Sequence, residues 1–156
     1  KHFPGHGATA GDTHDGYAFT EKTIEELQSC ELIPFRDGIR AGIPFIMVGH
    51  FSLPQVTGDS LPASLSPAVI TGLLREEMGF DGIVITDALN MGAIAQQYSS
   101  AEAAILALKA GNDILLMPAD FKSAYQGVLD AVARGELTTE RIDESVRRIL
   151  RIKLAG

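Results

Sequence analysis

The sequence predicts an α/β fold whose parallel strands are joined by right-handed helical crossovers. Short all-apolar runs such as IPFIMVG and ILLMP, typical of strands buried on both faces, alternate with helical patterns to the end of the chain. With 156 residues, 46% of them hydrophobic, the chain is long enough for one domain with a core. This pattern alone is compatible with a barrel or an open sheet, and three strands cannot close a barrel of eight.

The chain opens with KHFPGHGATAGDTH, a glycine-rich loop that holds three histidines, a lysine and an aspartate. Glycine loses more conformational freedom on folding than any other residue, so such a loop is costly to order. Structure alone rarely requires this composition, which makes the loop a candidate functional segment.

The first helical segment follows this loop. Thr23-x-x-Glu26 is a capping box that predicts a helix from about Ile24 to Ala41, with Pro34 as a break or kink inside it. The apolar run from Ile43 to His50 then predicts the first strand, which ends on a histidine.

The second strand follows a second helix. Ser66 is the expected N-cap of that helix, with proline at its first position and Gly79 at its end. The segment from Gly82 to Gly92 holds the second strand, Ile83-Val84-Ile85, which continues into Thr86-Asp87 and so ends on a carboxylate.

The last third of the chain repeats the alternation. Ser99-x-x-Glu102 caps a helix that Gly111 stops, and Asn112 to Pro118 give the third strand. Asp120 opens a helix to about Arg134, which Gly135 stops. A final helix carries an apolar face formed by Ile142, Val146, Ile149 and Leu150.

Composition excludes several classes of function. The apolar runs are far shorter than the roughly 20 residues of a membrane span. A net charge of -7 without a basic stripe argues against nucleic acid as the main partner. Cys30 is the only cysteine, so there is no disulfide framework or thiolate metal cluster. A neutral or small polar ligand is the favoured partner.

Candidate site residues follow the predicted strands. His50 and Asp87 fall at carboxyl ends of strands, where ligands bind in parallel α/β folds, and the opening loop falls at the same edge. A carboxylate after three branched aliphatic residues must be bonded, paired or functional, because burying it alone is too costly. Asp87 is therefore either a capping aspartate or a functional group.

The opening loop supplies the other candidates. Asp12 and His14 can hydrogen-bond if the loop turns, and a carboxylate would then orient a proton-shuttling imidazole; the alternative is an Asx-turn beside an exposed histidine. Lys1, His2 and His6 could donate to ligand hydroxyls, although for His6 a structural role bracing the loop is favoured.

Two other interpretations stay open. A metal site could be built from His2, His6, Asp12, His14, His50 and Asp87. A structural or binding role without chemistry is the second. A nucleotide-binding loop is disfavoured, because GHGATAG lacks the G-x-x-x-x-G-K-[ST] and G-x-G-x-x-G spacings.

The motifs KHFPGHG, GDTH and VITDALNMGA together resemble glycoside hydrolase family 3, in its β-N-acetylglucosaminidase branch. The resemblance runs from Lys1 to the ESVRRILRIK helix. It implies a (β/α)8 TIM barrel of which residues 1–156 are the second half of a single catalytic domain, from the loop after strand five to helix eight. The N-terminal half is expected to lie outside this chain.

The resemblance also implies a site. Asp87 matches the nucleophile of a retaining β-N-acetylhexosaminidase, His14 the general acid/base, and Asp12 the aspartate that holds it. Lys1 and His2 match residues that bind sugar hydroxyls, and His50 is expected to line the same pocket as a substrate-binding residue. Neither a cofactor nor a metal is expected.

The implied substrate is a peptidoglycan-derived fragment, such as a muropeptide, with β-N-acetylglucosamine at its non-reducing end. A phosphorylase using the same site is one alternative, because a neutral histidine does not repel phosphate. A metal-dependent barrel hydrolase and a non-catalytic sugar-binding protein are others. LLMPADFKSAYQGVLDAV resembles exported Gram-positive relatives, which favours an exported or cell-surface protein over a cytoplasmic one.

Overall fold

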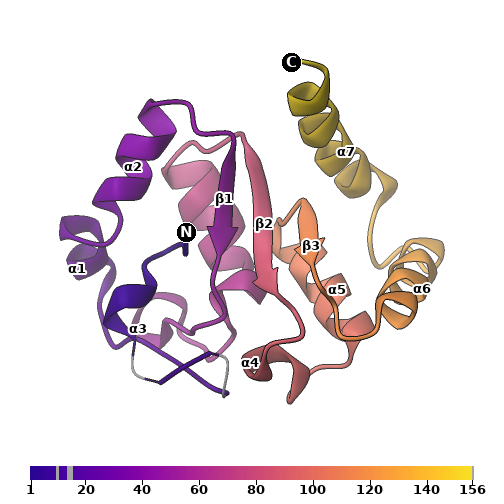
Figure 1. The fold of residues 1–156 in the computed structure, drawn as a ribbon, viewed down its shortest axis with the longest axis horizontal. Coiled ribbons are helices and arrows are strands. Elements are labelled where there is room, and N and C mark those ends of the chain that lie inside the picture. Colours follow the sequence, from indigo (N-terminus) through magenta and orange to yellow (C-terminus); the bar gives the residue numbers. More distant parts are fainter. Residues whose placement is uncertain (10, 14–15, 156) are drawn as a thin grey trace.

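A parallel three-stranded sheet in the order β1-β2-β3 lies at the centre of the computed structural model, which describes residues 1–9, 11–13 and 16–155 (Figure 1). The predicted α/β fold with a parallel sheet is confirmed. In chain order the described elements are η1 (His6–Ala8), α1 (Ile24–Ser29), α2 (Ile33–Arg40), β1 (Phe45–Val48), α3 (Pro54–Thr57), η2 (Ala63–Leu65), η3 (Ala68–Glu77), β2 (Ile83–Ala88), α4 (Gly92–Ala95), α5 (Ser100–Ala110), β3 (Ile114–Leu116), α6 (Phe121–Ala133) and α7 (Thr139–Leu154).

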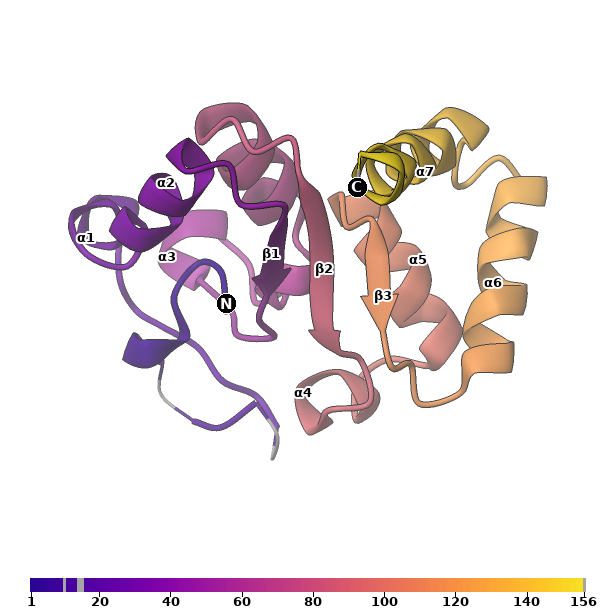
Figure 2. The same cartoon turned by 45° about the horizontal axis from the view of Figure 1, so that its top comes forward.

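One face of the sheet carries the core. Ile46 lies opposite Val84 and Val48 opposite Thr86, and all four side chains are buried. Helices η3 and α5 lie behind this face of the sheet (Figure 2). Phe45, on the other face, is 45% exposed. The expectation that the strands are buried on both faces is therefore wrong for β1, because the described helices cover only one side of it.

The first residues of the chain run beside β1. Phe3 forms an isolated parallel bridge with Val48, in which the Phe3 N–H donates to the Met47 carbonyl at 2.7 Å and the Gly49 N–H donates to the Phe3 carbonyl at 3.0 Å. The Phe3 ring is fully buried and meets Phe35 of α2 edge to face at 5.1 Å. Residues 1–3 thus occupy the place of a further strand end next to β1.

The predicted helix from Ile24 to Ala41 is two helices, α1 and α2. The capping box is confirmed, since the Thr23 N–H donates to Glu26 Oε2 at 2.8 Å and Thr23 Oγ1 accepts from the Glu26 N–H. The break falls ahead of Pro34, which lies in the first turn of α2. Proline fits there because its missing N–H would have no partner inside the helix.

The helix after Ser66 differs from expectation at its start. The Ser66 hydroxyl is buried and has no hydrogen-bond partner among the described residues, so it is not the predicted N-cap. The Ser66 carbonyl instead accepts from the Ile70 N–H at 3.1 Å. Helix η3 then has the wide spacing of a π-helix, with the Met78 N–H bonded to the Leu73 carbonyl. Gly79 ends it with a φ of 72°, as predicted.

The last third agrees more closely with the sequence. Ser99 forms the second capping box, Gly111 ends α5 in a left-handed conformation, and Asp120 accepts from the Ser123 N–H at the start of α6. The apolar face expected on the last helix is only partly covered, because Val146 and Leu150 of α7 are exposed while Ile142 packs against Leu108, Ala131 and Leu137. Within the described parts of the chain, no helix is long and apolar enough to cross a bilayer.

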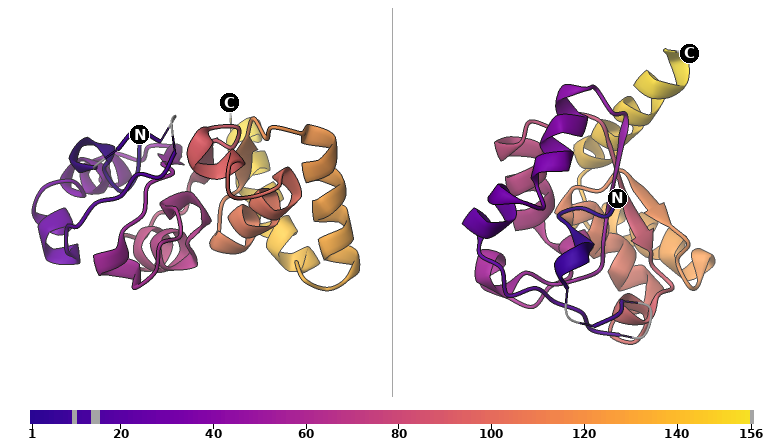
Figure 3. Two further views of the ribbon diagram at one scale, coloured as in Figure 1. Left: turned by 90° about the horizontal axis from the view of Figure 1, so that it is seen from below. Right: turned by 60° about the vertical axis from the view of Figure 1, so that its left-hand side comes forward.

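The carboxyl ends of the strands gather the elements that matter for function. Figure 1 shows β1, β2 and β3 all pointing toward the edge where helix α4 lies, and the left view of Figure 3 shows the molecule from that side. Short elements at this edge, α3, η2 and α4, were not predicted. They are four residues long or shorter, which is too short for a periodic pattern to show.

Candidate active site

The end of β2 is irregular where Asp87 lies. Ile85 lies opposite Ile114, but Ala88 lies opposite Leu116, so β2 uses one residue more than β3 over this stretch. The Leu116 N–H donates to the Thr86 hydroxyl oxygen at 3.0 Å. Such a bulge re-aims the side chains around it, and here it places a carboxylate at the strand end.

The two oxygens of Asp87 have different surroundings. Oδ1 accepts from the N–H of the next residue, Ala88, at 2.8 Å. Oδ2 lies 3.5 Å from Nε2 of His2. The Asp87 side chain retains 16% exposure, and the backbone orients its carboxylate through Oδ1.

His50 contacts the backbone next to Asp87. It is 1% exposed, and its Nε2 lies 3.0 Å from the Ala88 carbonyl oxygen while Nδ1 lies 2.7 Å from the Ser64 hydroxyl. Because a carbonyl can only accept, we assign the proton to Nε2, and Nδ1 then accepts from Ser64. Burial lowers the pKa of His50, and the hydrogen bond to the Ala88 carbonyl opposes that shift only in part.

His50 lies just after the carboxyl end of β1, as expected, and its ring contacts protein groups. Both of its ring nitrogens are bonded within the protein, so it braces the Ala88 peptide rather than presenting a donor to a ligand. Its role as a substrate-binding residue stays a prediction.

His2 faces Asp87 as a neutral ring. Partial burial lowers the pKa of His2, and the nearby Asp87 carboxylate opposes this without cancelling it. The histidine is then mostly uncharged near neutral pH, so it can donate a hydrogen bond without neutralising the Asp87 carboxylate.

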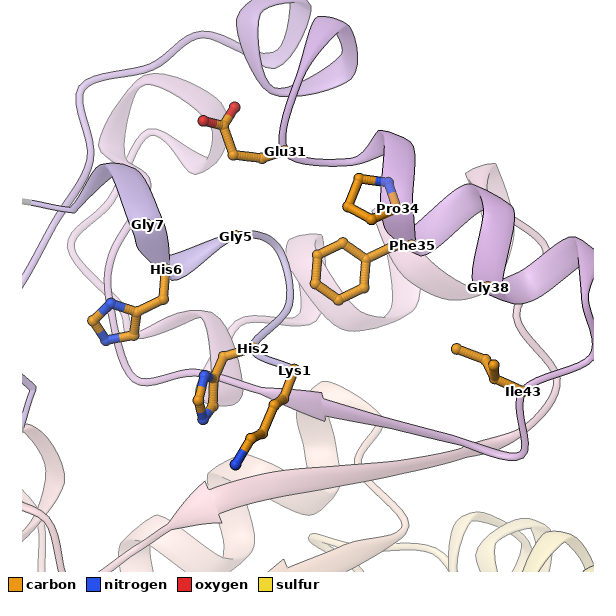
Figure 4. A pocket seen from close by; sticks show the side chains of 10 residues that line it. All are labelled: Lys1, His2, Gly5, His6, Gly7, Glu31, Pro34, Phe35, Gly38 and Ile43. Atoms are coloured by element: carbon orange, nitrogen blue, oxygen red, sulfur yellow. The ribbon is translucent and has the colours of Figure 1, made fainter.

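Lys1 and His2 also line a cavity of about 590 Å³ between the start of the chain and α2. In Figure 4 their side chains point toward the strands, away from Glu31 and Phe35 on the other side of the cavity. Glu31 is engaged by Lys22 in an ion pair. Asp87 is not among the residues that line this cavity, and His2 is the residue that both lines it and contacts Asp87.

The acid/base pair expected on the loop is described only in part. Asp12 is exposed, and its carbonyl accepts from the Gly16 N–H at 3.1 Å. His14 lies outside the described residues. The Asp12–His14 pair therefore stays a prediction.

His6 braces this loop, as the favoured interpretation of the sequence has it. Its Nε2 lies 3.1 Å from the Thr13 hydroxyl and its Nδ1 3.0 Å from the Thr9 hydroxyl. The Thr13 side chain is buried, and the Thr13 carbonyl accepts from the Ala93 N–H of α4 at 3.2 Å.

No group of three or more histidine, cysteine, aspartate or glutamate side chains among the described residues could hold a metal ion. The set considered from the sequence includes His14, which is not described. Of the rest, His50 and His6 already have both ring nitrogens bonded to protein groups.

Sequence reasoning missed three supporting residues: Thr13, Ser64 and Thr86. The hydroxyls of Thr13 and Ser64 contact the rings of His6 and His50, and the Thr86 hydroxyl accepts from the Leu116 N–H next to the bulge at Asp87. A hydroxyl residue in a loop or strand is compatible with many surroundings, so nothing in the sequence singles these out.

The chain is similar to known proteins over nearly its whole length. A family model described as glycosyl hydrolase family 3 N terminal domain matches residues 1–152. Beta-hexosaminidase A of Pseudoalteromonas piscicida is 35% identical over an alignment 173 positions long, which covers 98% of this chain and 29% of the relative.

Solved structures agree with this similarity. A glycoside hydrolase family 3 beta-N-acetylglucosaminidase from Paenibacillus sp. str. FPU-7 matches with a TM-score of 0.96 and 43% identity, covering 99% of this chain and 30% of that one. The beta-glucoside phosphorylase BglX bound to 2FGlc matches with a TM-score of 0.90 and 28% identity, covering 96% of this chain and 28% of that one. The chain thus spans about three tenths of the length of these relatives.

Proposed function

The chain belongs to glycosyl hydrolase family 3, and on that premise we propose that its protein is a retaining β-N-acetylhexosaminidase that removes β-N-acetylglucosamine from the non-reducing end of a glycan. Relatives named beta-hexosaminidase and a solved beta-N-acetylglucosaminidase support the glycosidase activity. The substrate class and the reaction course belong to the proposal.

The observation that carries this proposal is the geometry of Asp87. Its carboxylate is oriented through Oδ1 by the Ala88 N–H, while Oδ2 faces a mostly neutral His2. A nucleophile must be held in one direction, and the hydrogen bond from the Ala88 N–H favours this for Asp87. In the proposed first step, Asp87 attacks the anomeric carbon as the bond to the leaving oxygen breaks, giving a covalent glycosyl-enzyme.

The second functional group is the Asp12–His14 pair. Most retaining glycosidases use two carboxyl groups about 5–5.5 Å apart, one of which protonates the leaving oxygen. Here a histidinium would give that proton, and the neutral imidazole would then take a proton from the water that releases the sugar from Asp87. Asp12 would stabilise the cation and fix the tautomer. The glycines on both sides of this pair would let the loop close over bound sugar and reopen.

Lys1 and His2 complete the proposed sugar site. An ammonium and an imidazole N–H are donors for sugar hydroxyls. His2 lies at the Asp87 carboxylate, so a sugar bound there would be held next to the attacking oxygen. We expect His50 to act on the same site through the Ala88 peptide.

We further propose that these strands form half of a (β/α)8 barrel, with the other half supplied from outside residues 1–156. The parallel strand order and the parallel pairing of Phe3 with β1 support this assignment, because both continue in one direction around a sheet. The sheet face that carries Asp87 would then line the barrel mouth.

Family membership also supports a peptidoglycan-derived substrate. The expected reaction is release of N-acetylglucosamine from a muropeptide or a similar glycan fragment. Comparing hydrolysis of such a fragment with hydrolysis of an N-acetylglucosamine disaccharide tests this choice, and faster turnover of the disaccharide would contradict it.

A phosphorylase using the same residues is the second candidate. The similarity to a structure named as a beta-glucoside phosphorylase favours keeping it. Phosphate would replace water as the group that releases the sugar from Asp87. Added phosphate would then yield N-acetylglucosamine 1-phosphate, whereas a hydrolase gives free sugar at every phosphate concentration.

The alternatives from other classes have separate tests. A metal-dependent hydrolase would lose activity to a chelator and regain it with zinc, whereas the proposed mechanism has no step through a metal. A sugar-binding protein without chemistry would bind N-acetylglucosamine in both the native and the Asp87→Asn protein and turn over no substrate.

The decisive experiment is covalent labelling of the full-length protein with a slow fluorinated β-N-acetylglucosaminide, followed by peptide mass mapping. We expect the sugar on the peptide that contains Asp87. The Asp87→Asn protein should not be labelled, and Asp37→Asn, which changes an exposed carboxylate on α2, should be labelled like the native protein. An unlabelled native protein that still hydrolyses an aryl β-N-acetylglucosaminide would contradict the covalent role of Asp87.

A further inference from the structure

His6 sits between two threonines whose hydroxyls define its protonation. The Thr9 hydroxyl donates its one hydrogen to the His6 carbonyl at 2.8 Å. The same oxygen lies 3.0 Å from His6 Nδ1, so it accepts from an Nδ1–H. The Nε2 atom then carries a lone pair, which accepts from the Thr13 hydroxyl at 3.1 Å.

Thr13 is a fixed point in an otherwise exposed segment. Its side chain is 1% exposed, whereas its described neighbours Gly11 and Asp12 are exposed. Two contacts hold it: the hydroxyl bonds to His6, and the carbonyl accepts from the Ala93 N–H of α4 at 3.2 Å. Helix α4 follows β2, the strand that carries Asp87. The two contacts therefore join Thr13 to the start of the chain and to the helix after Asp87.

The position of Thr13 in the chain gives these contacts a meaning. It is the residue between Asp12 and His14 in the sequence, so it is covalently joined to both members of the proposed acid/base pair. The His6 ring also packs edge to face against Phe51, with the ring centroids 5.2 Å apart. This packing holds the His6 ring in place.

We propose that His6 is a positioning residue for proton transfer: through Thr13 it holds the loop that carries the acid/base pair. This inference rests on the proposed function, since it needs a glycosidase whose leaving oxygen is protonated from that loop. Both ring nitrogens of His6 contact threonine hydroxyls, so in this proposal its effect passes through the hydrogen bond to Thr13.

Two amide substitutions separate the two contacts of His6. Glutamine places a polar atom near the position of Nε2 and so keeps the contact with Thr13, whereas asparagine places one near Nδ1 and keeps only the contact with Thr9. If the Thr13 contact is what matters, His6→Gln should behave like the native protein and His6→Asn should not. A role in general stability alone would not distinguish the variants in this order.

The measurement is kcat/KM of the full-length protein on two aryl β-N-acetylglucosaminides. The 2,4-dinitrophenyl group leaves without a proton, whereas the phenyl group needs one, and general acid catalysis contributes about 10²–10⁴-fold to such a step. We expect His6→Asn to lose about tenfold or more on the phenyl substrate and less than about threefold on the dinitrophenyl one. His6→Gln should stay within about threefold of native on both.

Substitutions at the other end of the bond provide an independent check. Thr13→Val removes the hydroxyl and should reproduce the pattern of His6→Asn, while Thr13→Ser keeps it and should not. Thr71→Val is the matched control, because the Thr71 hydroxyl, on η3, also donates a hydrogen bond, in this case to the Ala110 carbonyl. It should leave both substrates unchanged. If His6→Asn fails to fold, the Thr13 pair carries the test.

Each outcome decides one question. If the native enzyme is active, two results would overturn the role of His6: equal losses of His6→Asn on both substrates, or no loss in Thr13→Val. Either result would leave the proposed function standing. A native protein that hydrolyses neither substrate would overturn the proposed function, and the inference about His6 with it.

Discussion

Nε2 of His2 lies 3.5 Å from Oδ2 of Asp87, so the start of the chain and the end of β2 meet at one point. The two residues are distant in sequence, and they meet because residues 1–3 run parallel to β1, which pairs with β2. The site is therefore assembled by the sheet, and changes to the sheet should reach it.

The first prediction concerns a substitution at Thr86. Replacing it with valine keeps the side-chain shape but removes the acceptor of the Leu116 N–H, in a residue that is fully buried. Loss of that hydrogen bond should destabilise the protein by about 1–3 kcal/mol. Because the bulge lies next to Asp87, kcat should fall more than KM rises. Urea unfolding and initial rates test both effects.

Thr86→Ser is the matched control, since it keeps the hydroxyl. It should recover most of the stability and the rate. Equal rates for the valine and serine variants would contradict the link between the bulge and Asp87.

His50 predicts how stability depends on pH. Burial lowers its pKa below 6.5 in the folded protein, while the unfolded chain binds a proton with the ordinary value. The unfolded state therefore holds more protons just below pH 6.5, so the free energy of unfolding should fall as the pH falls through this range. Urea titrations of the native protein and His50→Gln at several pH values should show a weaker pH dependence in the variant.

The outcome that contradicts this prediction is an unchanged slope of stability against pH in His50→Gln. A loss of stability of the same size at every pH would not support the titration of His50, because it reflects only the lost contacts with Ser64 and Ala88.

Asp113 holds the opposite end of the sheet together. Its carboxylate is fully buried and contacts Arg75 at 2.6 Å, Arg148 at 3.2 Å and the Val84 N–H at 2.9 Å. Asp113→Ala would leave the largely buried Arg75 without its counter-charge, which costs about 3–5 kcal/mol in comparable cases. Denaturant unfolding of the two proteins measures this loss.

An exposed pair gives the comparison. Arg40 and Asp37 are 3.2 Å apart, with side chains 77% and 64% exposed. Asp37→Ala should change stability by less than about 1 kcal/mol. Similar losses at the two aspartates would show that burial does not set the strength of the Asp113 contacts.

Gly127 predicts a steric effect between α5 and α6. A Cβ atom at Gly127 would lie 2.5 Å from Cβ of Ala101, so Gly127→Ala should push the helices apart. Overpacking of this kind costs about 1–3 kcal/mol. Gly72→Ala in η3 meets nothing closer than 4.0 Å and should be neutral or slightly stabilising. Melting temperatures of the two variants should therefore shift in opposite directions or differ clearly.

Much of the fold could be predicted because local signals agreed with it. The capping boxes at Thr23 and Ser99, the stop at Gly111 and the strand before Asp87 are all set by residues within one or two turns. The N-cap at Ser66 was wrong because its hydroxyl became buried by contacts that sequence does not reveal.

The site was harder to predict for the same reason. Asp87 and His2 carried visible chemistry, but their meeting depends on pairing between distant segments. His50 is buried and contacts the Ala88 carbonyl, and its place after a strand does not reveal this contact in the sequence. The Thr86 hydroxyl contacts Leu116, which lies far along the chain, and the Thr13 hydroxyl contacts His6 within the same loop, where many pairings are possible.

The bridge between Phe3 and Val48 fixes the register of the first residues. Neighbouring side chains in an extended strand point to opposite faces, so a slip of one residue exchanges the faces. Phe3 is buried beside Phe35, which leaves His2 on the face of Asp87. The burial of Phe3 thus decides on which side of the sheet the His2 side chain lies. A redesign of the site around His2 and Asp87 would therefore have to keep Phe3.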